Sequence, residues 1–241
     1  MRAVFNYVTD LKQALSFHPE QPVETPHFAK RQGNDVEFLV DGEEAMWSIA
    51  SALQDARETV DICDWKMDPE IVLVRRDGPL QGLRIRDLLA AAAARGVAVR
   101  VLLYRSPPLF ELTHNKRTAR MLRRLHPNIA CLCKRWSLVF SHHEKLIVVD
   151  GRVAFIGGLD LARGRFDTNE HPLDALRTTA DGFPLFPSTD FNNAQVDGAR
   201  RWKTPRMPWH DVECRLAGPV VADLATHFDE RWGFYGGARR D

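Results

Sequence analysis

The sequence of 241 residues has little net charge and no long apolar run. A net charge of +1 at pH 7 gives no global field that would attract nucleic acid or an anionic membrane, so any affinity for phosphate must come from local clusters. No stretch of about 18 consecutive apolar residues is present, so we expect no transmembrane helix. Residues 1–5 lack the apolar stretch of a secretory signal. We therefore expect a cytoplasmic protein, or one exported without a cleavable signal peptide, that is peripheral at membranes.

The sequence also has few cysteines, four in all, without the dense spacing of a disulfide scaffold. Cys131 and Cys133 are two residues apart and would share a face of a strand. We interpret them as buried thiols rather than as a metal or redox pair. On residue types alone, zinc binding by His142, His143 and this cysteine pair is the alternative. We expect no metal.

What the sequence does contain is an alternation of strand-like and helix-like segments. Strands are expected at residues 36–40, 59–65, 97–104, 129–133, 145–149, 152–156 and 211–216. Helices are expected at residues 45–56, 83–95, 116–125 and 219–232. This alternation predicts an α/β domain with a mixed, largely parallel β-sheet flanked by helices.

The domain is expected to span residues 36–241, and residues 1–35 are expected to form a leader or an arm packed on it. Within the domain, residues 165–208 break down into polar residues, proline and glycine. A loop of that length is more often functional than a simple connector.

The segment 141–158 carries the candidate chemistry. His143 and Lys145 are two residues apart, and on a strand they would share one face, which places an imidazole beside an ammonium. A phosphate oxyanion suits that pair, because the imidazole can attack or donate a proton while the ammonium neutralises oxygens. Asp150 opens a predicted hairpin turn. Gly157 and Gly158 leave room for a ligand close to the backbone.

His143, Lys145 and Asp150 form the pattern HxKxxxxD, and Gly157-Gly158 follow after six intervening residues. This pattern resembles the signature of the phospholipase D superfamily. The segments 64–70, 102–104, 125–129, 155–167, 204–212 and 228–232 resemble the first catalytic half of eukaryotic-type phospholipases D.

The resemblance implies a two-step displacement without metal or cofactor, through a phosphohistidine formed on the attacking histidine. Lys145 would bind phosphate oxygens, and Asp150 closes the catalytic motif although its place at a turn suggests a structural role. The family also supplies a carboxylate that orients the histidine, for which Asp211 is the first choice and Glu213 the second.

The resemblance further implies that Gly157, Gly158 and Asp160 bind substrate. The aspartate at position 160 matches the lipase-like branch, so we expect hydrolysis or transphosphatidylation of glycerophospholipids at a membrane surface. The alternative is a nuclease or another phosphodiesterase of the superfamily, which the near-zero net charge disfavours, so nucleic acid is an unlikely partner. The basic residues between 116 and 124 could contact anionic head groups or could form a solvated helix face.

The chain departs from the family in carrying one such motif where full-length members carry two. None of the other eight histidines begins a second HxKxxxxD pattern, since His114 is followed by Lys116 but has Met121 at the position of the aspartate. The second half-site is therefore expected from a homodimer mate or from another chain, such as a missing C-terminal half. A catalytically incomplete half-domain is the remaining alternative.

Overall fold

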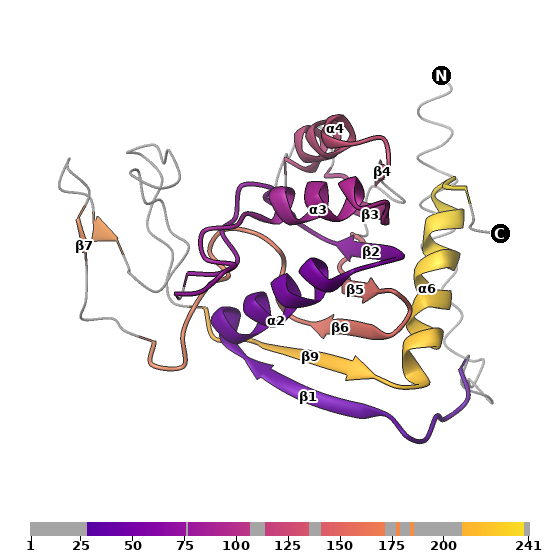
Figure 1. Cartoon of the computed structure of the whole chain (residues 1–241), viewed down its shortest axis with the longest axis horizontal. Coiled ribbons are helices and arrows are strands. Elements are labelled where there is room, and N and C mark those ends of the chain that lie inside the picture. The colour runs from indigo at the N-terminus through magenta and orange to yellow at the C-terminus, as the bar shows by residue number, and fades with distance from the viewer. Residues whose placement is uncertain are drawn as a thin grey trace, which may run out of the picture.

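The computed structural model describes residues 28–75, 77–106, 114–134, 141–171, 177–178, 184–185 and 209–238, which build a seven-stranded sheet with flanking helices (Figure 1). The strands of this sheet are β1 (Asp35–Val40), β2 (Thr59–Asp64), β3 (Ala98–Tyr104), β4 (Ile129–Lys134), β5 (Lys145–Val149), β6 (Val153–Gly157) and β9 (Val212–Ala217). The helices described are α2 (Asp41–Asp55), α3 (Ile85–Ala94), α4 (Asn115–Leu125) and α6 (Val220–Phe234). A separate short hairpin pairs β7 (Arg177–Thr178) with β8 (Pro184–Leu185).

The strand order in the large sheet is β1-β9-β6-β5-β2-β3-β4. The pairs β2–β3 and β3–β4 are parallel, whereas β1–β9, β9–β6, β6–β5 and β5–β2 are antiparallel. The predicted α/β class with a mixed sheet is confirmed, but the prediction that the sheet is largely parallel is wrong. Parallel neighbours need a crossover, which α3 and α4 provide, whereas β5 returns directly into β6 and must run antiparallel to it.

Each face of the sheet buries its own hydrophobic cluster. On one face, α2, α3 and α4 cover strand residues such as Ile62 and Ile147. On the other face, α6 packs Phe228 against a cluster that includes Cys63 and Leu146. Because successive residues of a strand point to opposite faces, neighbours in the sequence are sorted into different clusters. The same rule decides which side chains can meet at a site on the sheet.

Helix α2 begins earlier than the sequence predicts. The sequence suggests that Asp41 and Gly42 end β1 as a turn, but both are buried and are the first residues of α2. A Cβ at position 42 would lie 2.4 Å from the carbonyl oxygen of Arg165, so the helix start approaches that backbone more closely than a larger residue would allow. The backbone N–H of Asp41 donates to the carbonyl of Asp211 at 2.9 Å. The first turn of α2 is therefore fixed by two segments that lie far downstream in the sequence.

The hairpin turn predicted at Asp150 and Gly151 is confirmed. Both residues have positive φ angles, +53° and +61°, which aspartate and glycine tolerate better than most residues. The Asp150 carboxylate accepts the backbone N–H groups of Arg57 at 2.9 Å, Glu58 at 2.7 Å and Thr59 at 2.8 Å. The turn between β5 and β6 thereby also fixes the start of β2.

The four cysteines are free thiols, as expected. Cys63 and Cys131 are buried, whereas Cys133 and Cys214 are half-buried. Cys131 and Cys133 both pack toward the cluster under α3 and α4, so the predicted shared face of β4 is confirmed.

Residues 1–27 lie outside the described residues, so the leader or arm expected at residues 1–35 stays a prediction for most of its length. The end of it that is described lies against α6, where Arg31 forms two hydrogen bonds with Asp223, at 2.8 and 2.9 Å. The loop expected at residues 165–208 is described at 165–171 and in the β7–β8 hairpin. No helix in the described ranges is long and apolar enough to cross a membrane.

A buried ion pair connects the sheet to α6. Arg100 of β3 donates from Nε and Nη2 to the two carboxylate oxygens of Asp61 of β2, at 2.7 and 2.8 Å. Its Nη2 also pairs with Asp229 of α6 at 2.7 Å, and its guanidinium lies 4.9 Å from the ring centroid of Phe228. Arg100 is 6% exposed and Asp61 is 3% exposed, so removing either one would leave a buried charge without its partner.

We expect Arg100→Met to lower the free energy of unfolding by about 3–5 kcal/mol, because the Asp61 carboxylate would stay buried without the guanidinium. The double variant Arg100→Met with Asp61→Leu removes both charges and should recover most of that loss. Urea denaturation of the wild type and both variants measures the difference. Equal destabilisation of the single and the double variant would contradict this account.

Candidate active site

His143 and Lys145, which the sequence places on one face, lie in contact at the start of β5. Lys145 is the first residue of the strand, and its Nζ is 3.0 Å from Nε2 of His143. An ammonium group can only donate, so Nε2 is the acceptor and carries the lone pair that faces Lys145. Lys145 is 8% exposed, whereas His143 is exposed to solvent. The pair combines a buried cation with an accessible imidazole.

Asp160 is the buried counter-charge of this cation. Its Oδ1 lies 3.0 Å from Nζ of Lys145, and its Oδ2 lies 3.1 Å from Nη2 of Arg165. The Arg165 guanidinium in turn stacks over the ring of Trp209, at 3.9 Å from the ring centroid. The sequence suggested that Asp160 binds substrate, and the structure places it 1% exposed between two cations.

The protonation state of His143 follows from these neighbours. Partial burial and the Lys145 ammonium lower the pKa of His143 below its usual range, although the Asp160 carboxylate opposes this shift. The imidazole is therefore neutral at pH 7 and keeps a lone pair for attack or for proton transfer.

Trp65 completes the immediate surroundings of His143, and the sequence did not point to it as a site residue. Its ring meets the His143 ring edge-on, with centroids 5.2 Å apart, and Nζ of Lys145 lies 5.6 Å from its centroid. Trp65 directly follows β2, whose last residue, Asp64, is paired with Lys145. Only the pairing of β2 with β5 brings Trp65 to the site, so the order of the strands was the missing signal.

Glu213 lies in the same cross-strand row as Lys145. Asp64 of β2 is opposite Lys145 of β5, and Gly157 of β6 is opposite Glu213 of β9. Residues that are opposite each other in antiparallel strands share a face. A Cβ at position 157 would lie 2.6 Å from Oε2 of Glu213. The absence of a side chain at Gly157 thus leaves the space that the Glu213 carboxyl occupies over β6.

The two acids of this row are held largely neutral. Burial raises the pKa of Glu213 to about 8. Burial, together with the nearby Asp160 carboxylate, raises the pKa of Asp64 well above its usual range. The raised pKa values of both acids reduce the negative charge that opposes Lys145 and Arg165, the two cations that pair with Asp160. Such a site suits a phosphodiester monoanion.

Asp211, the predicted orienting acid, lies over the second glycine of the pair. A Cβ at Gly158 would lie 2.0 Å from Oδ1 of Asp211. The Asp211 carboxylate accepts hydrogen bonds from Nε1 of Trp209 and from the backbone N–H of Val212, both at 2.9 Å. Within the described part of the chain, Asp211 makes no hydrogen bond to His143.

Asp150 lies at the other end of β5 from Lys145. Five residues of strand separate the two ends, which corresponds to about 17 Å. The Asp150 carboxylate bonds three backbone N–H groups at the start of β2. Of the three motif residues, the structure therefore brings His143 and Lys145 together and leaves Asp150 apart.

His142 points away from His143, toward the face of the sheet that α6 covers. Its Nε2 lies 3.1 Å from Sγ of Cys63 and 2.9 Å from Oε2 of Glu144, on the face covered by α6. In the described ranges, two groups have the geometry to hold a metal ion, namely Cys63 with His142 and Glu144, and Asp41 with His171 and His210. Neither group includes His143, Cys131 or Cys133, so the zinc site considered from residue types is not assembled.

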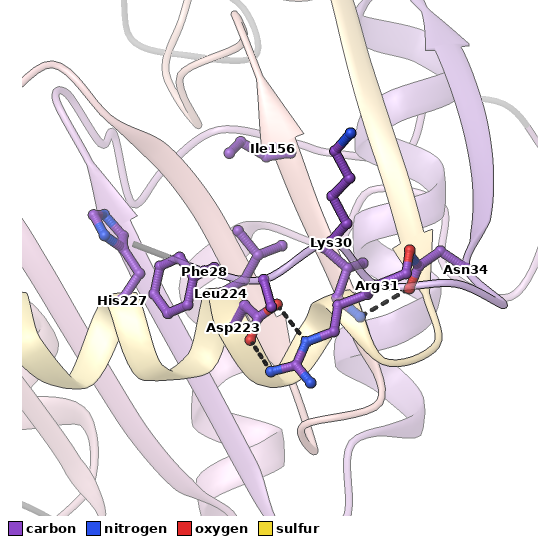
Figure 2. A pocket seen from close by; sticks show the side chains of 10 residues that line it. Phe28, Lys30, Arg31, Asn34, Ile156, Asp223, Leu224 and His227 are labelled. Carbon is purple, nitrogen blue, oxygen red and sulfur yellow. Dashed lines mark hydrogen bonds and ion pairs between the residues drawn. The ribbon is translucent and has the colours of Figure 1, made fainter. Parts of the chain in front are cut away.

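A pocket of about 620 Å³ lies away from these residues (Figure 2). It is lined by Phe28, Arg31 and their neighbours, by Ile156 of β6, and by residues of α6 that include Asp223 and His227. Because α6 covers the face of the sheet opposite to α2 and α3, this pocket and the Lys145 row lie on different faces.

The fold places the imidazole of His143 beside the buried ammonium of Lys145, which are two of the three residues of the HxKxxxxD motif. A family model described as phospholipase D matches residues 52–240, and the chain belongs to this family. The resemblance inferred from the motif is thereby confirmed.

Among the relatives of the chain, phospholipase D zeta 1 of Arabidopsis thaliana is 37% identical over 214 residues, which are 84% of this chain and 19% of that protein. Phospholipase D1 of Saccharomyces cerevisiae is 36% identical over 237 residues, which are 91% of this chain and 14% of that protein. The chain thus spans less than a fifth of either relative. The crystal structure of Nuc, a phospholipase D family member from Salmonella typhimurium, covers 86% of this chain at a TM-score of 0.48 and 15% identity, with all of that chain aligned.

The raised pKa of Glu213 predicts a loss of stability with rising pH. Between the unfolded pKa of about 4.3 and the folded value of about 8, the folded state keeps a proton that the unfolded state releases, so stability falls as the pH rises. Glu213→Gln removes the titrating group and therefore this dependence. Between pH 4 and pH 9, we expect the free energy of unfolding of the wild type to fall by on the order of 2–4 kcal/mol more than that of the variant. Unfolding followed against pH tests this, with Asp211→Asn as the matched control. Parallel curves for the wild type and Glu213→Gln would refute it.

Asp150 is predicted to act on stability rather than on chemistry. Asp150→Ala removes the acceptor of three backbone N–H groups and should lower the free energy of unfolding by about 2–3 kcal/mol. Backbone hydrogen bonds outweigh partial burial and lower the pKa of Asp150, so its contribution is present above the unfolded pKa of about 4 and is lost as the pH falls through the folded value. Denaturant unfolding measures the loss, and Asp150→Asn, which keeps a carbonyl acceptor, should lose less. Catalytic loss without destabilisation would assign Asp150 to the chemistry instead.

Proposed function

We propose that this chain supplies one half of a phospholipase D-type active site, with His143 as the nucleophile toward the phosphorus of a glycerophospholipid. The contact between the His143 imidazole and the buried Lys145 ammonium is the observation that carries the proposal. Because the pKa of His143 is lowered, its lone pair is available at neutral pH. The cations Lys145 and Arg165 favour the anionic phosphodiester and the additional charge that develops in the transition state.

In the first step, Nε2 of His143 gives up its hydrogen bond from Lys145 and forms a bond to phosphorus, while the bond from phosphorus to the head-group oxygen breaks. The leaving oxygen takes a proton from an acid on the second half-site. In the second step, the conjugate base of that acid takes a proton from water or from an alcohol, which attacks phosphorus as the bond to Nε2 of His143 breaks. Water releases phosphatidic acid, and an alcohol gives a new phosphodiester. Lys145 donates toward His143 and pairs with Asp160, which leaves a third N–H of its ammonium for a phosphate oxygen.

Glu213 is better placed than Asp211 to orient His143. Glu213 shares the cross-strand row of Lys145, and its carboxyl lies over Gly157 between β9 and β5. The Asp211 carboxylate is already occupied by two donors and lies over Gly158. We therefore assign the orienting role to Glu213, the second choice from the sequence, and a structural role to Asp211. Asp160 takes the role of holding Lys145, and Gly157 and Gly158 make room for the two carboxyls.

The second histidine is expected from outside this chain, because no other histidine here begins a complete HxKxxxxD pattern. A second copy of the chain or a different chain with its own motif can supply it. Relatives that are several times longer than this chain are compatible with either source.

Helix α4 supports a lipid surface as the place of the substrate. Its five basic residues are exposed, and the helix carries no acidic residue. Its first residue, Asn115, donates from Nδ2 to the backbone carbonyl of Trp65 at 2.8 Å, so the basic helix starts beside the segment that contacts His143. Each basic residue of α4 that lies near an anionic membrane surface would contribute about 1 kcal/mol to the free energy of binding to that surface.

The test is choline release from phosphatidylcholine vesicles by the full chain, with His143→Asn compared with the wild type. We expect the variant to lose activity by a factor of roughly 10³ or more, because covalent catalysis needs the imidazole. His126→Ala, a histidine at the end of α4, is the control and should retain activity. The oligomeric state is measured on the same sample by sedimentation.

Choline release from a dimer that His143→Asn abolishes would identify two copies of this chain as the complete centre. Undiminished turnover by His143→Asn would overturn the proposed nucleophile. Hydrolysis of single-stranded DNA at a higher rate than of phosphatidylcholine would assign the same chemistry to a nuclease.

A further inference from the structure

A second cluster of titratable side chains lies where α2 begins, outside the His143 site. Asp41 comes from the first turn of α2, Asp167 and His171 from the segment after β6, and His210 from the residues that lead into β9. Asp41 and Asp167 are fully buried, whereas the side chains of His171 and His210 are 35% and 65% exposed. We propose that Asp41, His171 and His210 bind a divalent transition-metal ion such as Zn²⁺, with Asp167 holding His171 in place.

The orientation of His171 is the first support. Its Nδ1 lies 2.7 Å from Oδ2 of the buried Asp167, so the ring carries a proton on Nδ1 that it donates to this carboxylate. Nε2 of the same ring faces Oδ2 of Asp41 at 3.5 Å, so a metal ion can take the place of a proton between these two atoms. Histidines that bind metals characteristically donate their other ring N–H to a carboxylate in this way, which fixes the tautomer and the direction of the lone pair.

The Asp41 carboxylate is the second support. Its Oδ1 accepts hydrogen bonds from Nδ1 of His210 at 2.8 Å and from the backbone N–H of Asp211 at 3.2 Å. Its Oδ2 is buried and has no hydrogen-bond donor among the described residues. A buried carboxylate oxygen without a donor is costly, so an electropositive partner is expected at this oxygen.

The separation of the two atoms fits a metal ion between them. Bonds of about 2.0–2.1 Å from Zn²⁺ to an imidazole nitrogen and a carboxylate oxygen, at a tetrahedral angle, place these atoms about 3.3 Å apart. Nε2 of His171 and Oδ2 of Asp41 are 3.5 Å apart. The rings of His171 and His210 lie 4.8 Å apart, so His210 can supply a third ligand to the same ion. Water would complete the tetrahedral shell on the exposed side.

The cluster formed by Cys63, His142 and Glu144 is less suited to an ion. Its ligand atoms lie 2.9–3.3 Å apart, which are hydrogen-bond distances. Glu144 also faces His227 at 3.4 Å and the cation of Arg231 at 3.3 Å, so its charge is already balanced.

The ion would join three segments that form one wall of the candidate active site. His210 is followed by Asp211, which lies over Gly158, and is preceded by Trp209, which stacks on Arg165. The ion would not touch the phosphodiester, and its existence does not depend on the proposed lipase activity.

The experiment measures Zn²⁺ binding to the full chain by competition with a chromophoric chelator and by zinc X-ray absorption. We expect one equivalent of Zn²⁺ in a shell of nitrogen and oxygen ligands that contains two imidazoles and no sulfur. At about a hundredfold excess over Kd, the bound ion should raise Tm by about 5 °C. His171→Ala should weaken binding by at least about 100-fold, since even second-shell changes cost 10–100-fold.

Two further variants separate the ion from the hydrogen bonds and from the other cluster. Asp41→Asn keeps a carbonyl acceptor for His210 and should fold but lose most of its Zn²⁺ affinity, whereas Cys63→Ser should bind as the wild type does. Binding that survives in His171→Ala, binding that is lost in Cys63→Ser, or sulfur in the metal shell would overturn the proposal. Absence of Zn²⁺ binding by a folded wild type at micromolar Zn²⁺ would also overturn the proposal. In that case His171 would be protonated on Nε2 and would donate this proton to Asp41.

Discussion

The ion pair between Lys145 and Asp160 is the interaction on which the candidate site depends. Its two side chains are 7% and 2% exposed, so both charges have been removed from water. A buried pair of this kind is tolerated only when further contacts satisfy it. Arg165 supplies the second contact to Asp160, and His143 takes another N–H of the Lys145 ammonium. The same contacts that balance the buried charges therefore also place the imidazole and lower its pKa.

The glycine pair at the end of β6 makes room for this arrangement. On a strand, neighbouring positions would normally fill both faces of the sheet with side chains. Gly157 and Gly158 leave those volumes to the carboxyl groups of Glu213, in the adjacent strand β9, and of Asp211, which precedes that strand. The sequence suggested that these glycines admit a ligand, whereas here the groups that approach their backbone are carboxyls of the protein itself. The two glycines thus shape the candidate site by leaving room for these two acids.

The segments that meet around Asp41 link the first helix to the end of the sheet. Asp41 receives the backbone N–H of Asp211, and Glu43 donates its own N–H to the carbonyl of Asp167 at 2.9 Å. Gly42 lies against the backbone of Arg165, whose side chain holds Asp160. A change in the position of the start of α2 would therefore be transmitted to Lys145 through Arg165 and Asp160. This continuity explains why positions far apart in the sequence belong to one structural unit.

The local parts of this protein were determined by the sequence alone. The period of apolar residues predicted the elements of the sheet. The His-x-Lys spacing predicted the contact between His143 and Lys145, because the two residues are only two apart in the chain, although β5 begins at Lys145 and does not include His143. The pairing of strands could not be predicted in that way. The row of Asp64, Lys145, Gly157 and Glu213 exists only because β2, β5, β6 and β9 are adjacent, and Trp65 and Arg165 reach the site through the same adjacency. Strand order depends on how different helices bury the two faces of the sheet. This packing involves the whole chain, so it cannot be predicted from any single segment.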